Sequence, residues 1–230
     1  MSGIAFFGDP HGNFDTFHEV VRSERPEVAI FLGDMGLQRP FEEEIGDAGC
    51  EVYWIHGNHD TDAEQYHDFL FNSALAERNL CNRVVEVGGL RIAGLGGVFR
   101  GTVWHPRPKN PGDAIEPPRF RSRGEFISAH RRTTWRGGLP RKQRSTIFPE
   151  DFEILSSLKA DILVTHEAPS CHQFGFEVID HLAERMGVHT IIHGHHHTDY
   201  DATLPNGIAV VGVAKEGVYR LQPPSPVLRP

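Results

Sequence analysis

The chain has 230 residues, of which 39% are hydrophobic and 23% charged, which is enough apolar material for a core without disulfide or metal staples. No apolar run approaches the about 20 residues of a membrane-spanning helix, and no basic, apolar signal stretch precedes the first predicted strand. We therefore expect one domain over residues 1–230, located in the cytoplasm and with no membrane partner. The three cysteines, Cys50, Cys81 and Cys171, are widely spaced, which argues against a disulfide framework or a structural zinc site.

The net charge of −8 is unevenly distributed. Residues 100–148 hold twelve Lys and Arg against three Asp and Glu, so this segment has a net charge of +9 and the remainder −17. Such asymmetry indicates an anionic partner near the segment. Its arginines would then grip phosphates of a nucleotide, polyphosphate or nucleic acid; alternatively, the segment is a solvated loop that balances the acidic body, or an oligomer contact.

In chain order, the first half alternates strands with helices. Apolar, β-branched or aromatic runs predict strands, and apolar residues at helical spacing predict helices. The elements expected are strands at 3–8, 28–32 and 51–55, helices at 13–25 and 62–78, and a hairpin of strands 83–87 and 90–95 that turns at Gly88-Gly89. Asn13 is the expected N-cap of the first helix, whose buried face carries Phe14, Phe17, Val20 and Val21.

Residues 100–148 interrupt this alternation. The segment is rich in Pro, Arg and Gly and lacks a clear period, so we expect an irregular cap inserted in the domain or a partly disordered stretch. Regular structure returns with a helix at 149–159, where Pro149 fits the first helical position, and a helix at 176–186 that ends at Gly187. The remaining strands are expected at 161–164, 190–192, 201–204, 208–213 and 218–221.

Five short motifs rich in His and Asp each follow a predicted strand. They are Gly8-Asp9-Pro10-His11-Gly12, Gly33-Asp34, Gly57-Asn58-His59-Asp60, His166 in Thr165-His166-Glu167-Ala168-Pro169, and Gly194-His195-His196-His197. Open α/β sheets build their sites at the carboxyl ends of strands, so the motifs are expected to meet there. Imidazole, carboxylate and one carboxamide form a ligand set suited to Mn, Fe or Zn, and the ligands suffice for two ions.

Each motif alone also has an ordinary structural interpretation, such as an Asp-Pro or Gly-Asp turn, a buried histidine or a His-rich surface stretch. Context favours the functional one. A carboxylate from Asp34, on the strand next to that of Asp9, could bridge two ions, and the imidazole of His59 beside Asp60 resembles one oriented by a carboxylate. His196 receives no role.

In this order and spacing, the motifs resemble those of the calcineurin-like metallophosphoesterase superfamily: D-x-H, G-D, G-N-H-[DE], a His, and G-H-x-H. The resemblance covers roughly residues 3–99 and 149–222 and leaves the basic segment outside. It implies an α/β fold of two packed mixed β-sheets flanked by helices, a four-layer αββα sandwich, here with an Arg/Pro-rich insertion at 100–148. It also implies two divalent metal ions, Mn first, with Fe, Zn or Ni as alternatives.

The resemblance assigns a role to each matching residue. One metal would be held by Asp9, His11 and His197, the other by Asn58, His166 and His195, with Asp34 bridging both. His59 would be the acid near the leaving group, oriented by Asp60. The family often has a further Asp at the position of Leu37, and its protein-phosphatase branch has an Arg at the position of Gln38, so these departures argue against protein Ser/Thr phosphatase activity.

We therefore expect a metal-dependent phosphoesterase in which a hydroxide held by two metals attacks phosphorus and His59 assists the leaving group. The expected substrate is a small phosphomonoester, phosphodiester or nucleotide. The alternatives are a nuclease that acts on DNA or RNA through the basic segment and, less favoured, a non-catalytic scaffold. The metal, the choice between mono- and diester, and the oligomeric state stay open.

Overall fold

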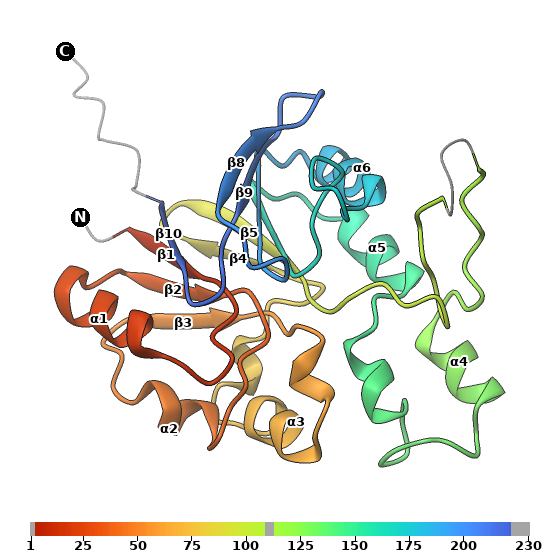
Figure 1. The fold of residues 1–230 in the computed structure, drawn as a ribbon, viewed down its shortest axis with the longest axis horizontal. Coiled ribbons are helices and arrows are strands. Elements are labelled where there is room, and N and C mark those ends of the chain that lie inside the picture. The colour runs from red at the N-terminus through yellow and green to blue at the C-terminus, as the bar shows by residue number, and fades with distance from the viewer. Residues whose placement is uncertain (1–2, 109–112, 222–230) are drawn as a thin grey trace.

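In the computed structural model, which describes residues 3–108 and 113–221, two mixed β-sheets pack face to face (Figure 1). The first has four strands in the order β10 (Val218–Leu221), β1 (Ile4–Phe7), β2 (Val28–Phe31) and β3 (Glu51–Trp54). The second has six, in the order β4 (Val84–Val87), β5 (Leu90–Leu95), β6 (Ile162–Thr165), β7 (Thr190–His193), β9 (Ala209–Gly212) and β8 (Tyr200–Thr203). Within each sheet the central strands are parallel, whereas β10, β4 and β8 pair antiparallel at the edges.

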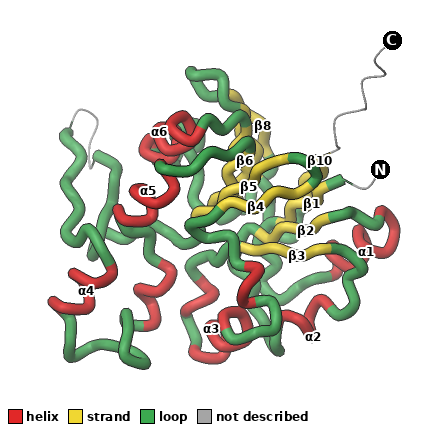
Figure 2. The backbone as a smooth tube through the Cα atoms, turned by 180° about the vertical axis from the view of Figure 1, so that it is seen from behind, coloured by secondary structure: helices red, strands yellow, loops and turns green. Residues whose placement is uncertain are grey.

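Helices cover the outer face of each sheet, as the view from behind in Figure 2 also shows. The four-stranded sheet is covered by α1 (Asp15–Glu24), α2 (Phe41–Ile45) and α3 (Glu64–Phe71), and the six-stranded sheet by α5 (Pro149–Ser156) and α6 (Glu177–Met186). A further helix, α4 (Arg123–Ala129), lies in the basic segment, and single 3₁₀ turns occur at His59–Thr61, Ala76–Arg78 and Arg141–Ser145. No helix among the described residues is long and apolar enough to cross a membrane.

The layers follow from the alternation of side chains along each strand. In β1, Ile4 and Phe6 pack between the two sheets, whereas Ala5 and Phe7 face the helix layer, where the ring of Phe7 contacts that of Phe17 in α1. Strands buried on both faces have to be apolar throughout, which explains their continuous hydrophobic runs. The prediction of a four-layer sandwich is confirmed.

Several local predictions are also confirmed. The hairpin between β4 and β5 turns at Gly88 and Gly89, whose φ angles of 57° and 78° are those of the left-handed region that such tight turns require. Pro149 occupies the first position of α5, and Gly187, with a φ of 77°, ends α6.

Two helix predictions were wrong in their bounds. The helix expected at 62–78 is only α3, because the hydroxyl of Ser73 binds the carbonyl of Leu70 and the N–H of Leu75 and so competes with the helical backbone. At the start of α1 the N-cap is Phe14 rather than Asn13, whose side-chain oxygen instead accepts the N–H of Asp15 in a turn one residue earlier. The short helix α2 was not predicted, since five residues are too few to establish a helical period.

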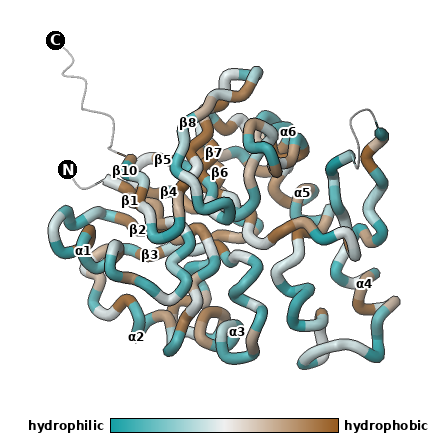
Figure 3. Tube along the Cα trace, viewed as in Figure 1, coloured by the Kyte–Doolittle hydropathy of each residue, from teal (hydrophilic) through white to brown (hydrophobic). Residues whose placement is uncertain are grey.

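The basic segment forms an irregular but packed unit around a small core of its own, made of Val103, Phe126, Leu139 and Phe148. The segment is anchored on the six-stranded side by a bridge between Val98 and Thr146. Figure 3 shows a largely hydrophilic or neutral tube around α4 with a few hydrophobic stretches. Lys109, one of the segment's twelve cations, lies outside the described residues.

Candidate metal centre

The five motifs converge at one edge of the sandwich. Parallel strands β1, β2 and β3 end there in one sheet, and β6 and β7 in the other. The loops that follow contact one another across the two sheets: both carboxylate oxygens of Asp9 accept the N–H of His195, and the carbonyl of Leu32 lies 2.8 Å from Nδ1 of His166. The structure thus brings together side chains that are up to 188 positions apart, at 9 and 197.

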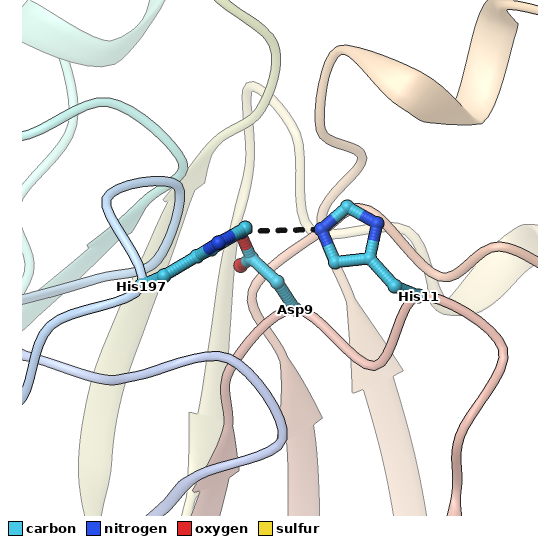
Figure 4. A group of neighbouring side chains, drawn as sticks. All are labelled: Asp9, His11 and His197. Atoms are coloured by element: carbon cyan, nitrogen blue, oxygen red, sulfur yellow. Dashed lines mark hydrogen bonds and ion pairs between the residues drawn. The ribbon is translucent and has the colours of Figure 1, made fainter.

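Asp9, His11 and His197 form the first group (Figure 4). Nε2 of His197 lies 3.2 Å from Oδ2 of Asp9 and 3.2 Å from Nε2 of His11. Asp9 is fully buried, whereas the two imidazoles reach toward it from the rim. Three donor atoms from two sheets therefore face a common point.

Asp34, His166 and His195 form the second group. Nε2 of His166 lies 3.4 Å from Oδ2 of Asp34 and 3.3 Å from Oδ1 of Asn58, so the carboxamide joins this group. His166 is completely buried.

Asp34 lies between the two groups. Its Oδ2 atom is 3.9 Å from Nε2 of His11 in the first group and 3.4 Å from Nε2 of His166 in the second. Its other oxygen, Oδ1, accepts the backbone N–H of His59 at 2.7 Å. One carboxylate oxygen thus faces both groups, the position that a bridging ligand requires.

The backbone is shaped to bring these side chains close. His11, Asp34, His195 and His197 all have positive φ angles, between 46° and 67°, which non-glycine residues adopt at a cost that surrounding contacts must offset. Gly57 is needed for a different reason, because a Cβ atom there would lie 2.2 Å from Oδ1 of Asp34. Strained positions of this kind are typical of functional sites.

The charged side chains of the centre stabilise one another. Burial raises the pKa of Asp34, but the charge of His166 and its hydrogen bond outweigh that effect and hold the pKa below its ordinary value. The pKa of Asp9 is lowered in the same way, by His166 and then by the hydrogen bond from His197 against the effect of burial. Burial opposes protonation of His166, yet Asp34 and Asp9 raise its pKa to about 10. A metal ion would replace that proton.

The residues fit a pair of divalent metal ions. Nδ1 of His166 is engaged by the carbonyl of Leu32, which leaves Nε2 free to coordinate a metal. A metal-bound histidine commonly makes such a contact to a backbone carbonyl through its other ring nitrogen. Imidazole nitrogens together with carboxylate and carboxamide oxygens suit Mn, Fe and Zn. Within each group, the candidate donor atoms all lie within 4.8 Å of one another.

The proposed acid, His59, lies at the rim of the centre with 52% of its side chain exposed, and its ring centroid is 5.5 Å from that of His11. Asp60 does not orient it, contrary to the prediction. Nδ1 of His59 lies 2.6 Å from Oδ2 of Asp62, since residues three apart share one side of the 3₁₀ turn that begins at His59.

Asp60 points inward instead. Its carboxylate accepts the N–H groups of Asp34, Met35 and Gly57 at 2.8–2.9 Å and so ties the second motif to the third. Burial and then the charge of Asp34 raise the pKa of Asp60 to about 7, against the effect of those hydrogen bonds. Asp60 thus holds the loops that present Asp34 and Asn58.

Sequence reasoning missed Glu167, which forms a third group with His195 and His196. One oxygen of its buried carboxylate accepts the N–H of Phe99, and the other lies 3.9 Å from Nε2 of His195. Burial raises the pKa of Glu167 to about 7. Its place directly after His166 was a usable signal, because a residue next to a ligand at a strand end shares the same edge of the sheet.

Residues 3–199 match the protein-family model of the calcineurin-like phosphoesterases. The chain belongs to the calcineurin-like phosphoesterase family. The resemblance found in the five motifs is thereby confirmed, and the protein is a metal-dependent phosphoesterase.

Similar proteins agree with this placement. An uncharacterized protein of Haemophilus influenzae is 41% identical over 227 residues, covering 95% of this chain and 96% of its own. Among solved structures, TT1561 of Thermus thermophilus has a TM-score of 0.58 at 14% identity, covering 93% of this chain and 89% of its own. A dimetal phosphatase from Danio rerio also has a TM-score of 0.58, at 12% identity and with 94% and 88% covered. At such low identity the two structures show a shared fold alone.

Proposed function

We propose that this phosphoesterase uses two divalent cations to hydrolyse the phosphate ester of a small molecule or nucleotide. The observation that carries the proposal is the position of Asp34, one oxygen of which faces ligands of both groups. Two ions that share a carboxylate can neutralise the phosphate oxygens and lower the pKa of a bound water toward about 7. The protein from Danio rerio that shares this fold is described as a dimetal phosphatase, which supports a two-metal site in this chain as well.

Each group would hold one ion. The first would be ligated by Asp9, His11 and His197, the second by Asn58, His166 and His195, with Asp34 common to both. Manganese is our first choice, with iron, zinc or nickel as alternatives, because the donors are nitrogen and oxygen without a thiolate. Asp60 and Glu167 would keep the ligand loops and His195 in place.

His59 would deliver a proton to the leaving oxygen. Its Nδ1 is engaged by Asp62, so the ring is oriented and the opposite nitrogen, Nε2, is left to meet a leaving group. Half-exposed at the rim, the side chain can reach a substrate without displacing a metal ligand. General-acid assistance is typically worth about 10²–10⁴-fold in rate.

A small substrate is favoured over nucleic acid by the contacts of the basic segment. Of its arginines, Arg123 and Arg136 are paired with carboxylates, and Arg107, Arg141 and Arg144 bind backbone carbonyls. A cation engaged in this way contributes less to an open track for a phosphodiester backbone than its charge suggests. Hydrolysis of DNA or RNA is therefore the second candidate.

The test is an activity panel on the purified protein loaded with Mn²⁺. The panel comprises aryl phosphomonoesters, aryl phosphodiesters, nucleotides, cyclic nucleotides and single-stranded DNA, with metal content measured on the same sample. We expect about two metal ions per chain and hydrolysis of a small ester. Two bound ions with no hydrolysis of any member of the panel would contradict the proposal, and single-stranded DNA as the best substrate would favour the nuclease.

A further inference from the structure

A sixth loop reaches the edge where the metal centre lies, and no motif marks it. Strand β5 runs parallel to β6, with Leu95 opposite Thr165, so its loop ends beside that of His166. The loop is fixed there by hydrogen bonds from the N–H of Gly97 to the carbonyl of His56 and from the N–H of Phe99 to Glu167. The next residue is Arg100, the first cation of the basic segment.

The guanidinium of Arg100 is held next to the third motif. Its Nη2 donates to the hydroxyl of Ser145 at 3.2 Å, and this hydroxyl lies 2.7 Å from that of Thr61 and 3.4 Å from the carbonyl of Asn58. Ser145 is fully buried, and its hydroxyl links Arg100 to the loop that carries Asn58.

Among the described residues, Arg100 finds few acceptors for its N–H groups. A guanidinium has five N–H donors, and the buried Nε of Arg100 finds no acceptor among the described residues. Asp62, Glu167 and Asp34 act on Arg100 through their charges, and the one hydrogen bond found for its guanidinium among the described residues is that to Ser145. Burial accordingly lowers the pKa of Arg100.

Two other arginines of the basic segment differ from Arg100, because their guanidinium groups are paired with carboxylates. Arg123 makes charged hydrogen bonds with both Glu150 and Asp151, and Arg136 does so with Glu64 and Asp68. Leaving a half-buried cation with open donors costs free energy, and an anionic ligand would supply the missing partner. Metal ions would neutralise the carboxylates of the centre. The anionic ligand would then attract Arg100 more strongly than those carboxylates do.

We propose that Arg100 binds peripheral oxygens of the substrate phosphate and makes this enzyme a phosphomonoesterase. A monoester phosphate carries up to two charges and three free oxygens, whereas a diester phosphate carries one charge and two. The guanidinium of an arginine binds a monoester phosphate more strongly on both counts, because it is positively charged and donates hydrogen bonds to two oxygens at once. This inference rests on the proposed function, since it assumes that the phosphate lies in the metal centre.

The experiment compares Arg100→Gln with Arg136→Gln, a matched control that removes one positive charge from the same segment but away from the centre. For the Mn²⁺-loaded proteins, kcat/KM is measured on an aryl phosphomonoester and on the corresponding diester. We expect the wild type to prefer the monoester. Arg100→Gln should lower kcat/KM for the monoester about 30- to 100-fold and for the diester less than about 5-fold, with both metals retained. Arg136→Gln should change neither.

A lysine variant separates recognition from structure. Arg100→Lys keeps the charge and a donor for Ser145 but loses the fork, so the preference for the monoester should fall several-fold while the protein stays folded. An equal loss on both esters, or an unchanged preference in Arg100→Lys, would overturn the role of Arg100, as would a wild type that prefers diesters.

Binding of inorganic phosphate, measured by calorimetry, distinguishes this inference from the proposed function. If the wild type hydrolyses no ester yet binds phosphate in an Arg100-dependent manner, the proposed function fails and the anion site stands. Phosphate binding that is unchanged in Arg100→Gln would remove the site itself.

Discussion

The metal-centre edge and the basic segment hold their charges in different ways. At the edge, the buried carboxylates of Asp9 and Asp34 face imidazoles and backbone N–H groups, and no Lys or Arg of the described chain is bonded to them. In the segment, Arg123 and Arg136 face carboxylates of neighbouring helices. Charge at the edge is available to a cationic ligand, whereas much of the segment's charge stabilises internal contacts. A basic stretch therefore indicates a binding surface only after its partners within the protein are known.

The largest effect is expected at the carboxylate shared by both groups. Asp34→Asn should lower kcat/KM by on the order of 10³-fold or more, because catalytic groups that act as a unit fail together. Metal content should fall as well, since both groups lose a ligand. The checks are steady-state kinetics and elemental analysis, with Asp15→Asn on the exposed first turn of α1 as the control. Full activity with two bound metals would exclude the bridging role.

The next effect concerns His59, which lies at the edge without belonging to either metal group. His59→Ala should keep both metals and lose about 10²-fold in kcat on esters with poor leaving groups, and much less on esters with good ones. His18→Ala, an exposed histidine of α1, is the matched control. The dependence of kcat on leaving-group pKa is the measurement, and a uniform loss across leaving groups would argue for a structural role.

Asp62 occupies the position beside His59 that was predicted for Asp60, whereas Asp60 binds backbone N–H groups of the second and third motifs. Asp60→Asn should lower the free energy of unfolding by about 1–3 kcal/mol, because a buried acceptor of three backbone N–H groups is impaired. Asp62→Asn should leave stability unchanged and reduce kcat about 10-fold through the orientation of His59. Denaturant unfolding and steady-state kinetics on both variants test these two roles. A loss of kcat in Asp60→Asn with a loss of stability in Asp62→Asn would restore Asp60 as the partner of His59.

The same residues show how far the sequence could lead. The convergence of the candidate ligands was predictable because each follows an apolar strand and because parallel strands end at one edge, as with Asp34 after β2 and His166 after β6. The carboxylate that contacts His59 was not predictable, since it depends on whether the chain after His59 forms a 3₁₀ turn that places residue 62 beside the imidazole. Arg100 could not be singled out among twelve cations, because the role proposed for it rests on its contact with Ser145, 45 positions away.

The smallest effects are expected at the carboxylate-paired arginines of the basic segment, Arg123 and Arg136, and test whether their charges are structural. Arg123 is half-buried, pairs with the buried Asp151 and lies over the ring of Phe148, so Arg123→Ala should cost about 1–2 kcal/mol of unfolding free energy. Arg136 is exposed, and ion pairs of that kind contribute little because water and salt screen them, so Arg136→Ala should leave the unfolding midpoint unchanged. Neither variant should alter kcat/KM on a small ester. A large loss of activity with intact stability in either would show that the segment binds substrate through more than Arg100, and the contrast between the two regions would no longer hold.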